Sequence, residues 1–330
     1  WGVDATSIIV KGAQDTELNG LDYADQIVTL SNTTGTITLD GAGAAATVIL
    51  SGGSVDSELA VETATSLTVN VAAASTISDI ANNDLTSLTI TGSGAFTLED
   101  AQTEGFTTIT ASGNTGGVTL QTVDYAATSI VGTSANDRIE GTDSLDFAND
   151  AVTINGGDGV DTLQIAQNVT DGAGVSNVEI VELAASGLEY TSGDIASATQ
   201  VVIATPGADN AGVNSDTAEV SGYNGSETIT ISDANMADDS EADTIALTID
   251  SADDYTDATT VAIVTTQDGG DNAIDYTVAD INFEVEGGGD EAASLTVNVS
   301  GTRGVTISNV DLSDNTGVLN ISSSVAIAVS

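Results

Sequence analysis

One segment of the chain has the residue types and spacing of a cation-binding turn. Residues 156–163 read Gly-Gly-Asp-Gly-Val-Asp-Thr-Leu. They fit the repeat Gly-Gly-x-Gly-x-Asp-x-apolar, which binds calcium in parallel β-helices, at every position. The glycines let the backbone turn with carbonyl groups directed inward, Asp161 supplies negative charge, and Leu163 fills the core behind the turn. The pattern therefore predicts an oxygen-lined turn suited to calcium.

A looser copy of this pattern lies upstream. Residues 132–139 read Gly-Thr-Ser-Ala-Asn-Asp-Arg-Ile, so Gly132 aligns with Gly156 and Asp137 aligns with Asp161. The copies begin 24 residues apart, whereas a full array needs several copies in tandem. We expect two related turns rather than a complete repeat array.

Composition excludes several kinds of chemistry. The 330 residues include 50 acidic and three basic residues, a formal charge of −47, with no histidine and no cysteine. Catalytic Ser-His-Asp and Cys-His sites and ordinary zinc sites are therefore excluded, and three basic residues cannot form a nucleic-acid-binding surface. Carboxylate pairs could hydrolyse sugars, but aromatic residues, which sugar sites use as platforms, make up only 3% of the chain. We expect no enzyme.

The elements that would position these turns are β-strands. Short runs rich in Thr, Val and Ile alternate polar and apolar residues, and Gly, Asn, Asp and Ser separate them. Their apolar centres recur about every twenty residues and then at longer intervals: Val69, Ile90, Ile109, Ile130, Ile154, Ile180 and Ile203. This recurrence favours an all-β fold of stacked strands, a β-solenoid or β-roll. Tandem β-sandwiches are the alternative, and Ser57–Glu62 and Gly193–Thr199 are the better candidates for short helices.

One supersecondary unit occurs twice. Ser-Leu-Thr-Val-Asn-Val stands at residues 66–71 and again at 294–299, and similar strand sequences come after each copy at nearly equal spacing. The only proline, Pro206, lies in a turn-rich stretch. We therefore predict an N-terminal β region, 1–204, and an acidic C-terminal β region, 205–330. One continuous structure is the alternative.

The two glycine-rich segments resemble the RTX-type calcium-binding segments of secreted bacterial proteins. The continuation at residues 175–183, Val-Ser-Asn-Val-Glu-Ile-Val-Glu-Leu, is similar to the stretch after such motifs in RTX-containing bacterial surface-layer proteins. The motif-level resemblance covers about residues 128–190. It implies that Asp161 and Asp137 give carboxylates to calcium. It also implies that other groups offer carbonyl or side-chain oxygens, namely Gly156, Asp158, Gly132 and Ser134.

These features together predict an extracellular structural protein. We expect it to be secreted, to be processed from a longer precursor because it begins at Trp1, and to lie at the cell surface. There it would assemble with copies of itself into a calcium-dependent surface layer, sheath or filament, with cell-surface polysaccharide as a further partner. The alternative is a calcium-stabilised adhesin or glycan-binding module. No apolar run is long enough to predict membrane insertion.

Overall fold

The computed structural model describes most of the chain. The described residues are 6–52, 56–81, 84–101, 106–123, 127–142, 145, 152–169, 172, 174–185, 187–204, 215–223, 227–232, 244–251, 259–266, 276–282, 295–302, 304–311 and 319–329. Within these ranges the structure is all β, with no helix. Accordingly, they include no helix that is long and apolar enough to cross a membrane.

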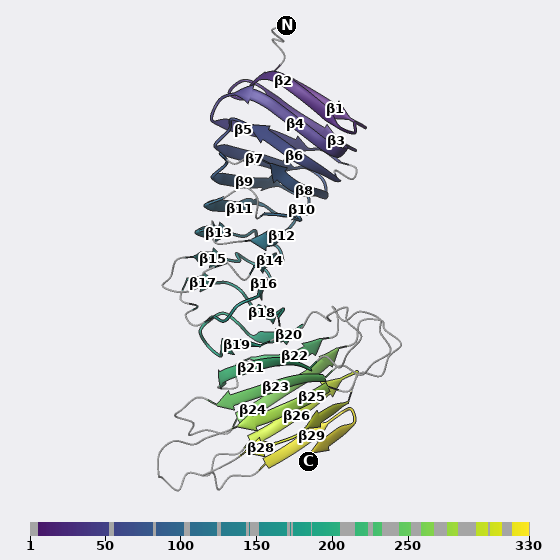
Figure 1. Ribbon diagram of the computed structural model, residues 1–330, viewed down its shortest axis with the longest axis vertical. Helices are drawn as coiled ribbons and strands as arrows, with labels where there is room; N and C mark the ends of the chain where they lie inside the picture. The colour runs from purple at the N-terminus through teal and green to yellow at the C-terminus, as the bar shows by residue number, and fades with distance from the viewer. Residues whose placement is uncertain are drawn as a thin grey trace. The chain divides into compact units, whose positions relative to one another are not determined.

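The chain forms two compact units, which we describe separately. Unit 1 comprises Trp1–Leu163 and Gly174–Val178, and unit 2 comprises Gln164–Ala173 and Glu179–Ser330. Both are parallel β-solenoids, in which successive strands alternate between two sheets and each strand pairs with the strand one coil away (Figure 1). The solenoid prediction is thus confirmed, and the sandwich alternative is wrong.

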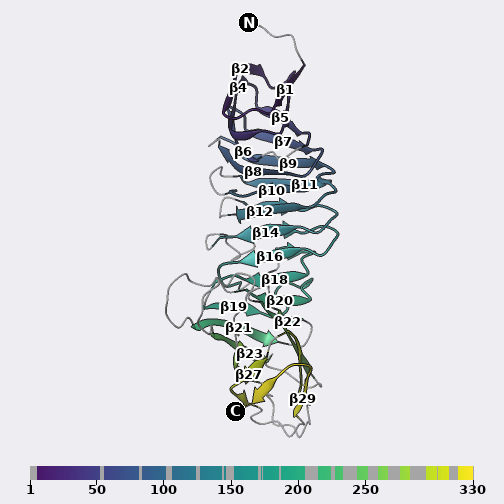
Figure 2. The same cartoon turned by 90° about the vertical axis from the view of Figure 1, so that its right-hand side faces the viewer.

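Unit 1 contains sheet A and the first part of sheet B (Figure 2). The nine strands of sheet A are β1 (Ser7–Lys11), β3 (Ile27–Ser31), β5 (Ala45–Leu50), β7 (Ser66–Val71), β9 (Ser87–Gly92), β11 (Thr108–Asn114), β13 (Ser129–Val131), β15 (Thr153–Asn155) and β17 (Val175–Ser176). The sheet B strands are β2 (Thr16–Asp22), β4 (Thr34–Ala42), β6 (Asp56–Glu62), β8 (Ser75–Ala81), β10 (Phe96–Leu98), β12 (Val118–Val123), β14 (Arg138–Gly141) and β16 (Thr162–Ile165), which begins in this unit.

Unit 2 repeats this alternation with the later strands of sheet B and with sheet C. The sheet B strands are β18 (Ile180–Leu183), β20 (Gln200–Ile203), β22 (Thr228–Ser232), β24 (Thr259–Thr266), β26 (Leu295–Gly301) and β29 (Leu319–Ser323). Sheet C contains β19 (Leu188–Thr191), β21 (Ser215–Tyr223), β23 (Thr244–Ser251), β25 (Tyr276–Asn282), β27 (Val305–Ile307), β28 (Val310–Asp311) and β30 (Ile327–Val329).

Alternation along each strand builds the core. In β7, Leu67, Val69 and Val71 are buried, whereas Ser66 and the other intervening residues are partly exposed. Side chains on a strand point to opposite faces in turn, so each coil contributes its Leu, Val and Ile to the interior. Pairing in register then stacks like on like, as Leu67 beside Leu88 shows.

Hydrogen bonds at one corner of unit 1 fix the coil length. The hydroxyl of Thr86 donates to the carbonyl of Thr65, that of Thr107 to Thr86, and that of Thr128 to Thr107, at 3.2, 3.0 and 2.9 Å. Each partner is 21 residues away. Thr153 continues this threonine ladder to Thr128 after a longer step of 25 residues. The recurrence near twenty in the sequence is therefore the length of a coil.

The predicted alignment of strand centres is partly wrong. Val69 pairs with Ile90 as expected, and Ile109 pairs with Ile130, but Ile109 also pairs with Leu88 rather than with Ile90. The error is two residues, which leaves the inward face unchanged because side chains alternate with a period of two. In addition, Ile180 lies in sheet B rather than sheet A.

Both helix predictions are wrong. Residues 57–62 belong to β6, which pairs with β4 and β8, and residues 193–199 form turns. The duplicated unit has a similar arrangement at both places. β7 pairs with β9 across one intervening strand of the other sheet, and β26 pairs with β29 across two short ones, β27 and β28. Pro206 lies outside the described residues, so the boundary near 205 stays a prediction.

Candidate metal-binding turns

The two glycine-rich segments form stacked turns in unit 1. Each leaves a sheet A strand, β13 or β15, and enters a sheet B strand, β14 or β16. The amide of Asp158 donates to the carbonyl of Thr133 at 3.2 Å, and the amide of Thr162 donates to the carbonyl of Asp137 at 2.9 Å. The turns therefore lie on the same side of the solenoid, one coil apart. This placement agrees with the alignment of Asp137 with Asp161.

The Asp137 carboxylate is buried and bonded to its surroundings. Asp137 is only 3% exposed. Oδ1 accepts from the amide of Val118 at 2.7 Å and from the hydroxyl of Thr133 at 2.9 Å, and Oδ2 accepts from the amide of Thr133 at 2.5 Å. One carboxylate thus closes its own turn and holds the first amide of β12 in the preceding coil.

Asp161 repeats half of this arrangement one coil later. It is 2% exposed, and its Oδ1 accepts from the amide of Asp137 at 2.8 Å. The two aspartates and Val118 therefore form a series in which each carboxylate bonds to the backbone of the coil before it. Hydrogen bonds to ionised carboxylates are stronger than neutral ones, so this series ties three coils together.

Burial and hydrogen bonding act in opposite directions on Asp137. Loss of solvent raises the pKa of its carboxyl above the ordinary value, while the hydrogen bonds from Thr133 and Val118 lower it in part. Burial is the larger effect, since it disfavours the charged form in a region with little water.

The predicted glycines are required by close packing between coils. A Cβ at Gly132 would collide with the carbonyl of Gly156 and lie 2.5 Å from Oδ2 of Asp137. A Cβ at Gly156 would collide with the carbonyl of Asn177 and lie 2.5 Å from Oδ2 of Asp161. Both glycines are buried. These glycines therefore let the coils and the carboxylates approach each other.

The other two predicted residues lie at the outer rim of the turns, where Ser134 and Asp158 are exposed. All six predicted residues are thus brought to one region, four inside and two outside. Calcium takes six to eight oxygen ligands, and here both oxygens of Asp137 already face N–H or O–H donors. The arrangement as it stands fits backbone bonding by that carboxylate, and calcium would have to replace those donors. Among the described residues, no three acidic side chains gather as a metal-binding group.

Sequence reasoning missed the partners of these carboxylates. Thr133 is 4% exposed and supplies two of the three donors to Asp137. Asn114, fully buried, plays a similar part in an earlier turn, where its Nδ2 donates to the carbonyl of Gly94 at 3.0 Å and its Oδ1 accepts from the amide of Gly116 at 2.7 Å. The sequence signal that could have identified Thr133 and Asn114 is a polar residue within or beside a glycine-rich turn.

Unit 2 contains a buried carboxylate of the same kind. Glu227 is 3% exposed, and its Oε2 accepts from the hydroxyl of Ser192 at 2.6 Å while its Oε1 accepts from the amide of Gly193 at 3.1 Å. Burial, together with the charges of Glu227 and Asp194, raises the pKa of the nearby Tyr190. A glutamate from a later coil therefore closes a turn in this unit.

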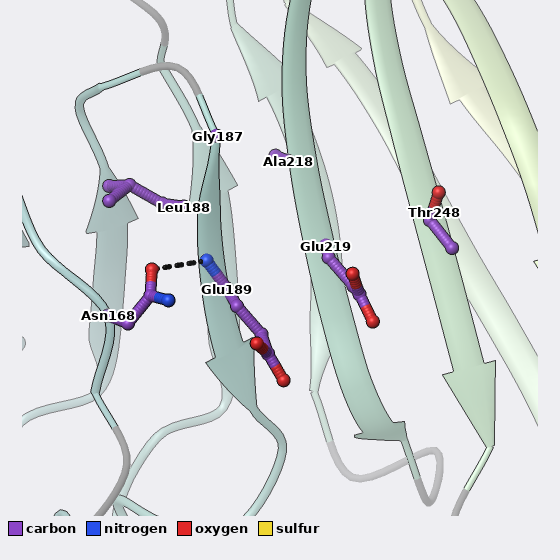
Figure 3. Close-up of a pocket in the computed structure, with 7 residues that line it drawn as sticks. All are labelled: Asn168, Gly187, Leu188, Glu189, Ala218, Glu219 and Thr248. Atoms are coloured by element: carbon purple, nitrogen blue, oxygen red, sulfur yellow. Dashed lines mark hydrogen bonds between the residues drawn. The ribbon is translucent and has the colours of Figure 1, made fainter.

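A hollow of about 200 Å³ lies over sheet C (Figure 3). Its polar lining includes Asn168, Glu189, Glu219 and Thr248, and the Oδ1 of Asn168 accepts from the amide of Glu189 at 2.9 Å. Glu189 and Glu219 occupy paired positions on neighbouring strands. The lining offers oxygen atoms and one amide group, and it contains no cationic side chain.

No protein-family model, no curated protein and no solved structure matches the chain.

Proposed function

We propose that this chain is an extracellular structural protein that assembles with copies of itself into a calcium-dependent surface layer, sheath or filament. One observation carries the proposal: buried carboxylates and threonine hydroxyls form hydrogen bonds from one coil to the next. Asp137 and Asp161 bond to the preceding coil, as do the hydroxyls of Thr86, Thr107 and Thr128. Groups used in this way maintain a rigid stack.

The calcium part of the proposal is supported by the paired acidic residues on the outer face of sheet B. Acidic residues occupy paired positions on neighbouring strands there, Asp40 beside Glu62 and Glu58 beside Asp79. Like charges directly opposite each other destabilise a sheet, and the chain has three basic residues to offset 50 acidic ones. A divalent cation bound by such carboxylates would replace repulsion with shared coordination. The predicted ligands at the glycine-rich turns remain part of this proposal.

Electron microscopy of the purified chain in calcium and in excess EGTA tests this function. We expect sheets or fibres in calcium and dispersed particles in EGTA. The melting temperature at low salt should also fall in EGTA, because a ligand that binds only the folded state stabilises it. Dispersed particles under both conditions would contradict self-assembly. If those particles bound an immobilised surface polysaccharide, they would indicate the calcium-stabilised adhesin instead.

A further inference from the structure

Acidic residues are distributed unequally between the two sheets of unit 1. The strands of sheet A contain none, although acidic residues make up 50 of the 330 in the chain. The strands of sheet B in the same unit carry acidic residues on their outer side or at their ends: Glu17, Asp22, Asp40, Glu58, Glu62, Asp79 and Glu140. Among the strands of unit 1, those of sheet B therefore carry acidic side chains and those of sheet A carry none.

The outer side of sheet A is instead rich in hydroxyl groups. We call it the uncharged face, and define it by the outward residues of the strands from β5 to β11, which pair in register: Thr47, Ile49, Ser66, Thr68, Asn70, Ser87, Thr89, Thr91, Thr108 and Thr110. In β1 and β3 the same side presents Ile9, 69% exposed, and Ile27, 39% exposed. Lys11, at the end of β1, is the one charged residue in the strands of this sheet.

A similar division occurs in unit 2. Glu182 of β18, which is buried, is the one acidic residue in the strands of sheet B in this unit, whereas the strands of sheet C carry Glu189, Asp216, Glu219, Asp250, Asp280 and Asp311. In each unit, the strands of one sheet thus present no acidic residue on their outer side or only a buried one, and the strands of the other sheet carry several. A surface whose acidic residues served only for solubility would not need this separation.

We propose that the uncharged face of sheet A is the surface on which a second copy of this chain docks, face to face, which rests on the proposed self-assembly. Two molecules that each carry a charge of −47 repel wherever carboxylates meet. On sheet A, hydroxyl and methyl groups of threonine can pack against their counterparts without bringing carboxylates together. A twofold contact of this kind uses the same patch on both copies.

The outer side of sheet A is large enough for such a contact. Strands lie about 4.8 Å apart and outward positions about 6.6 Å apart along a strand, so the four strands that define the uncharged face cover about 20 Å by 15 Å. The nine strands of sheet A, whose outer side continues this face at both ends, cover about 40 Å by 15 Å. A contact over the whole outer side of sheet A would bury on the order of 1,200 Å² in total, the lower end of the range for specific interfaces. The exposed Ile9 and Ile27 would add apolar area at one end.

Two matched double variants test this interface. Thr68→Asp/Thr89→Asp places two carboxylates on neighbouring strands of the uncharged face, and Thr97→Asp/Thr119→Asp does the same on sheet B. Both pairs are partly exposed threonines in adjacent coils, so net charge and strand propensity change equally. Sedimentation velocity should show association of the wild type and of the sheet B variant, with association of the sheet A variant weakened at least tenfold.

Cross-linking gives a second measurement that does not depend on added charge. The chain has no cysteine, so Thr89→Cys, in the central strand of sheet A, introduces a unique thiol. A twofold contact centred there brings two such thiols together across packed sheets about 10 Å apart. A bismaleimide of that length should cross-link Thr89→Cys into dimers and leave Thr97→Cys monomeric.

The outcomes separate this proposal from the proposed function. Undiminished association of Thr68→Asp/Thr89→Asp, together with no dimer from Thr89→Cys, would overturn the interface but leave self-assembly standing. Equal weakening by both double variants would also overturn it, because net charge rather than the face would then control association. A wild type that stays monomeric at all concentrations, with or without calcium, would overturn the proposed function itself.

Discussion

Replacement of Asp137 by alanine should destabilise the fold through the amides it leaves behind. The carboxylate accepts from the amides of Val118 and Thr133 and from the Thr133 hydroxyl, all in a buried turn. A buried donor without a partner costs about 1–3 kcal/mol, so two orphaned amides would cost about 2–6 kcal/mol. Loss of a carboxylate that was itself costly to bury offsets part of this. We expect a net loss of about 2–4 kcal/mol in the free energy of unfolding.

Urea unfolding measures this loss, and Asp158→Ala provides the matched control. Asp158 belongs to the equivalent stacked turn but is exposed, so its replacement should leave the unfolding midpoint close to that of the wild type. If Asp137→Ala unfolds at the wild-type midpoint, or if Asp158→Ala costs as much, the account of Asp137 as a link between coils is refuted.

Calcium distinguishes the two roles open to the same carboxylate. If Asp137 only bonds to backbone, the cost of Asp137→Ala should be equal in calcium and in EGTA. If it also binds calcium, the variant should lose more stability in calcium, because it loses the ligand-dependent stabilisation as well. This comparison tests the resemblance-based ligand assignment independently of assembly.

Titration, close packing and the threonine ladder give three more expected outcomes. First, burial raises the pKa of Asp137 above 3.8. Its folded form therefore binds a proton more tightly than its unfolded form, and its contribution to stability grows as pH falls through the raised pKa and is complete below 3.8. In urea unfolding from pH 7 to pH 4, the wild type should thus gain stability relative to Asp137→Asn; a constant difference would contradict this. Second, Gly156→Ala should cost several kcal/mol, because its Cβ would collide with the carbonyl of Asn177, whereas Gly12→Ala meets no atom within 4 Å and should cost about 1 kcal/mol through its positive φ alone; equal thermal shifts would contradict the packing argument. Third, Thr107→Val should lower the free energy of unfolding by about 0.5–1 kcal/mol, because it removes the hydrogen bond from the hydroxyl to the carbonyl of Thr86 but keeps a methyl group. An unchanged midpoint of urea unfolding would show that this hydrogen bond adds no stability.

The repeat length could be predicted from sequence because stacking imposes it. A coil must return the chain to the position directly above its start, so inward residues recur at the coil length, as Leu67, Leu88 and Ile109 do. The exact pairing could not be predicted, since Leu88 and Ile90 are both apolar and both point inward. A shift of two residues satisfies the hydrophobic pattern equally well.

The error at residues 57–62 has a different origin. Glu58, Leu59 and Ala60 individually favour helix, but the preceding and following coils offer strand edges on both sides, and Leu59 pairs with Ile37 and Ile80. Two ladders of hydrogen bonds and a fully buried leucine outweigh a small local preference. Such partners are far apart in sequence, so a local pattern could not reveal them.

At the candidate turns, the sequence motif predicted the positions of the aspartates and glycines but not the hydrogen-bond partners of the carboxylates. The pattern correctly placed Asp137 and Asp161 in equivalent turns, and the collisions expected at Gly132 and Gly156 explain why those positions are glycine. It could not show which atoms the carboxylate oxygens face, because the amide of Val118 comes from a coil 19 residues earlier. The direction of a side chain depends on the register between coils, which the motif does not contain.

The position of each carboxylate in the stack determines what calcium could do. A buried aspartate such as Asp137 already has hydrogen-bond donors, so removing calcium need not disturb it. Outward pairs such as Glu58 and Asp79 repel each other when both are ionised, unless a cation binds or screens them. Calcium dependence should therefore be strongest on the acidic faces, and the uncharged face of sheet A should associate even where carboxylates are only screened by monovalent salt. Raising sodium chloride in the absence of calcium should then preserve pairs of molecules while larger assemblies disappear, which is a result that neither a purely calcium-bridged lattice nor a monomeric adhesin would give.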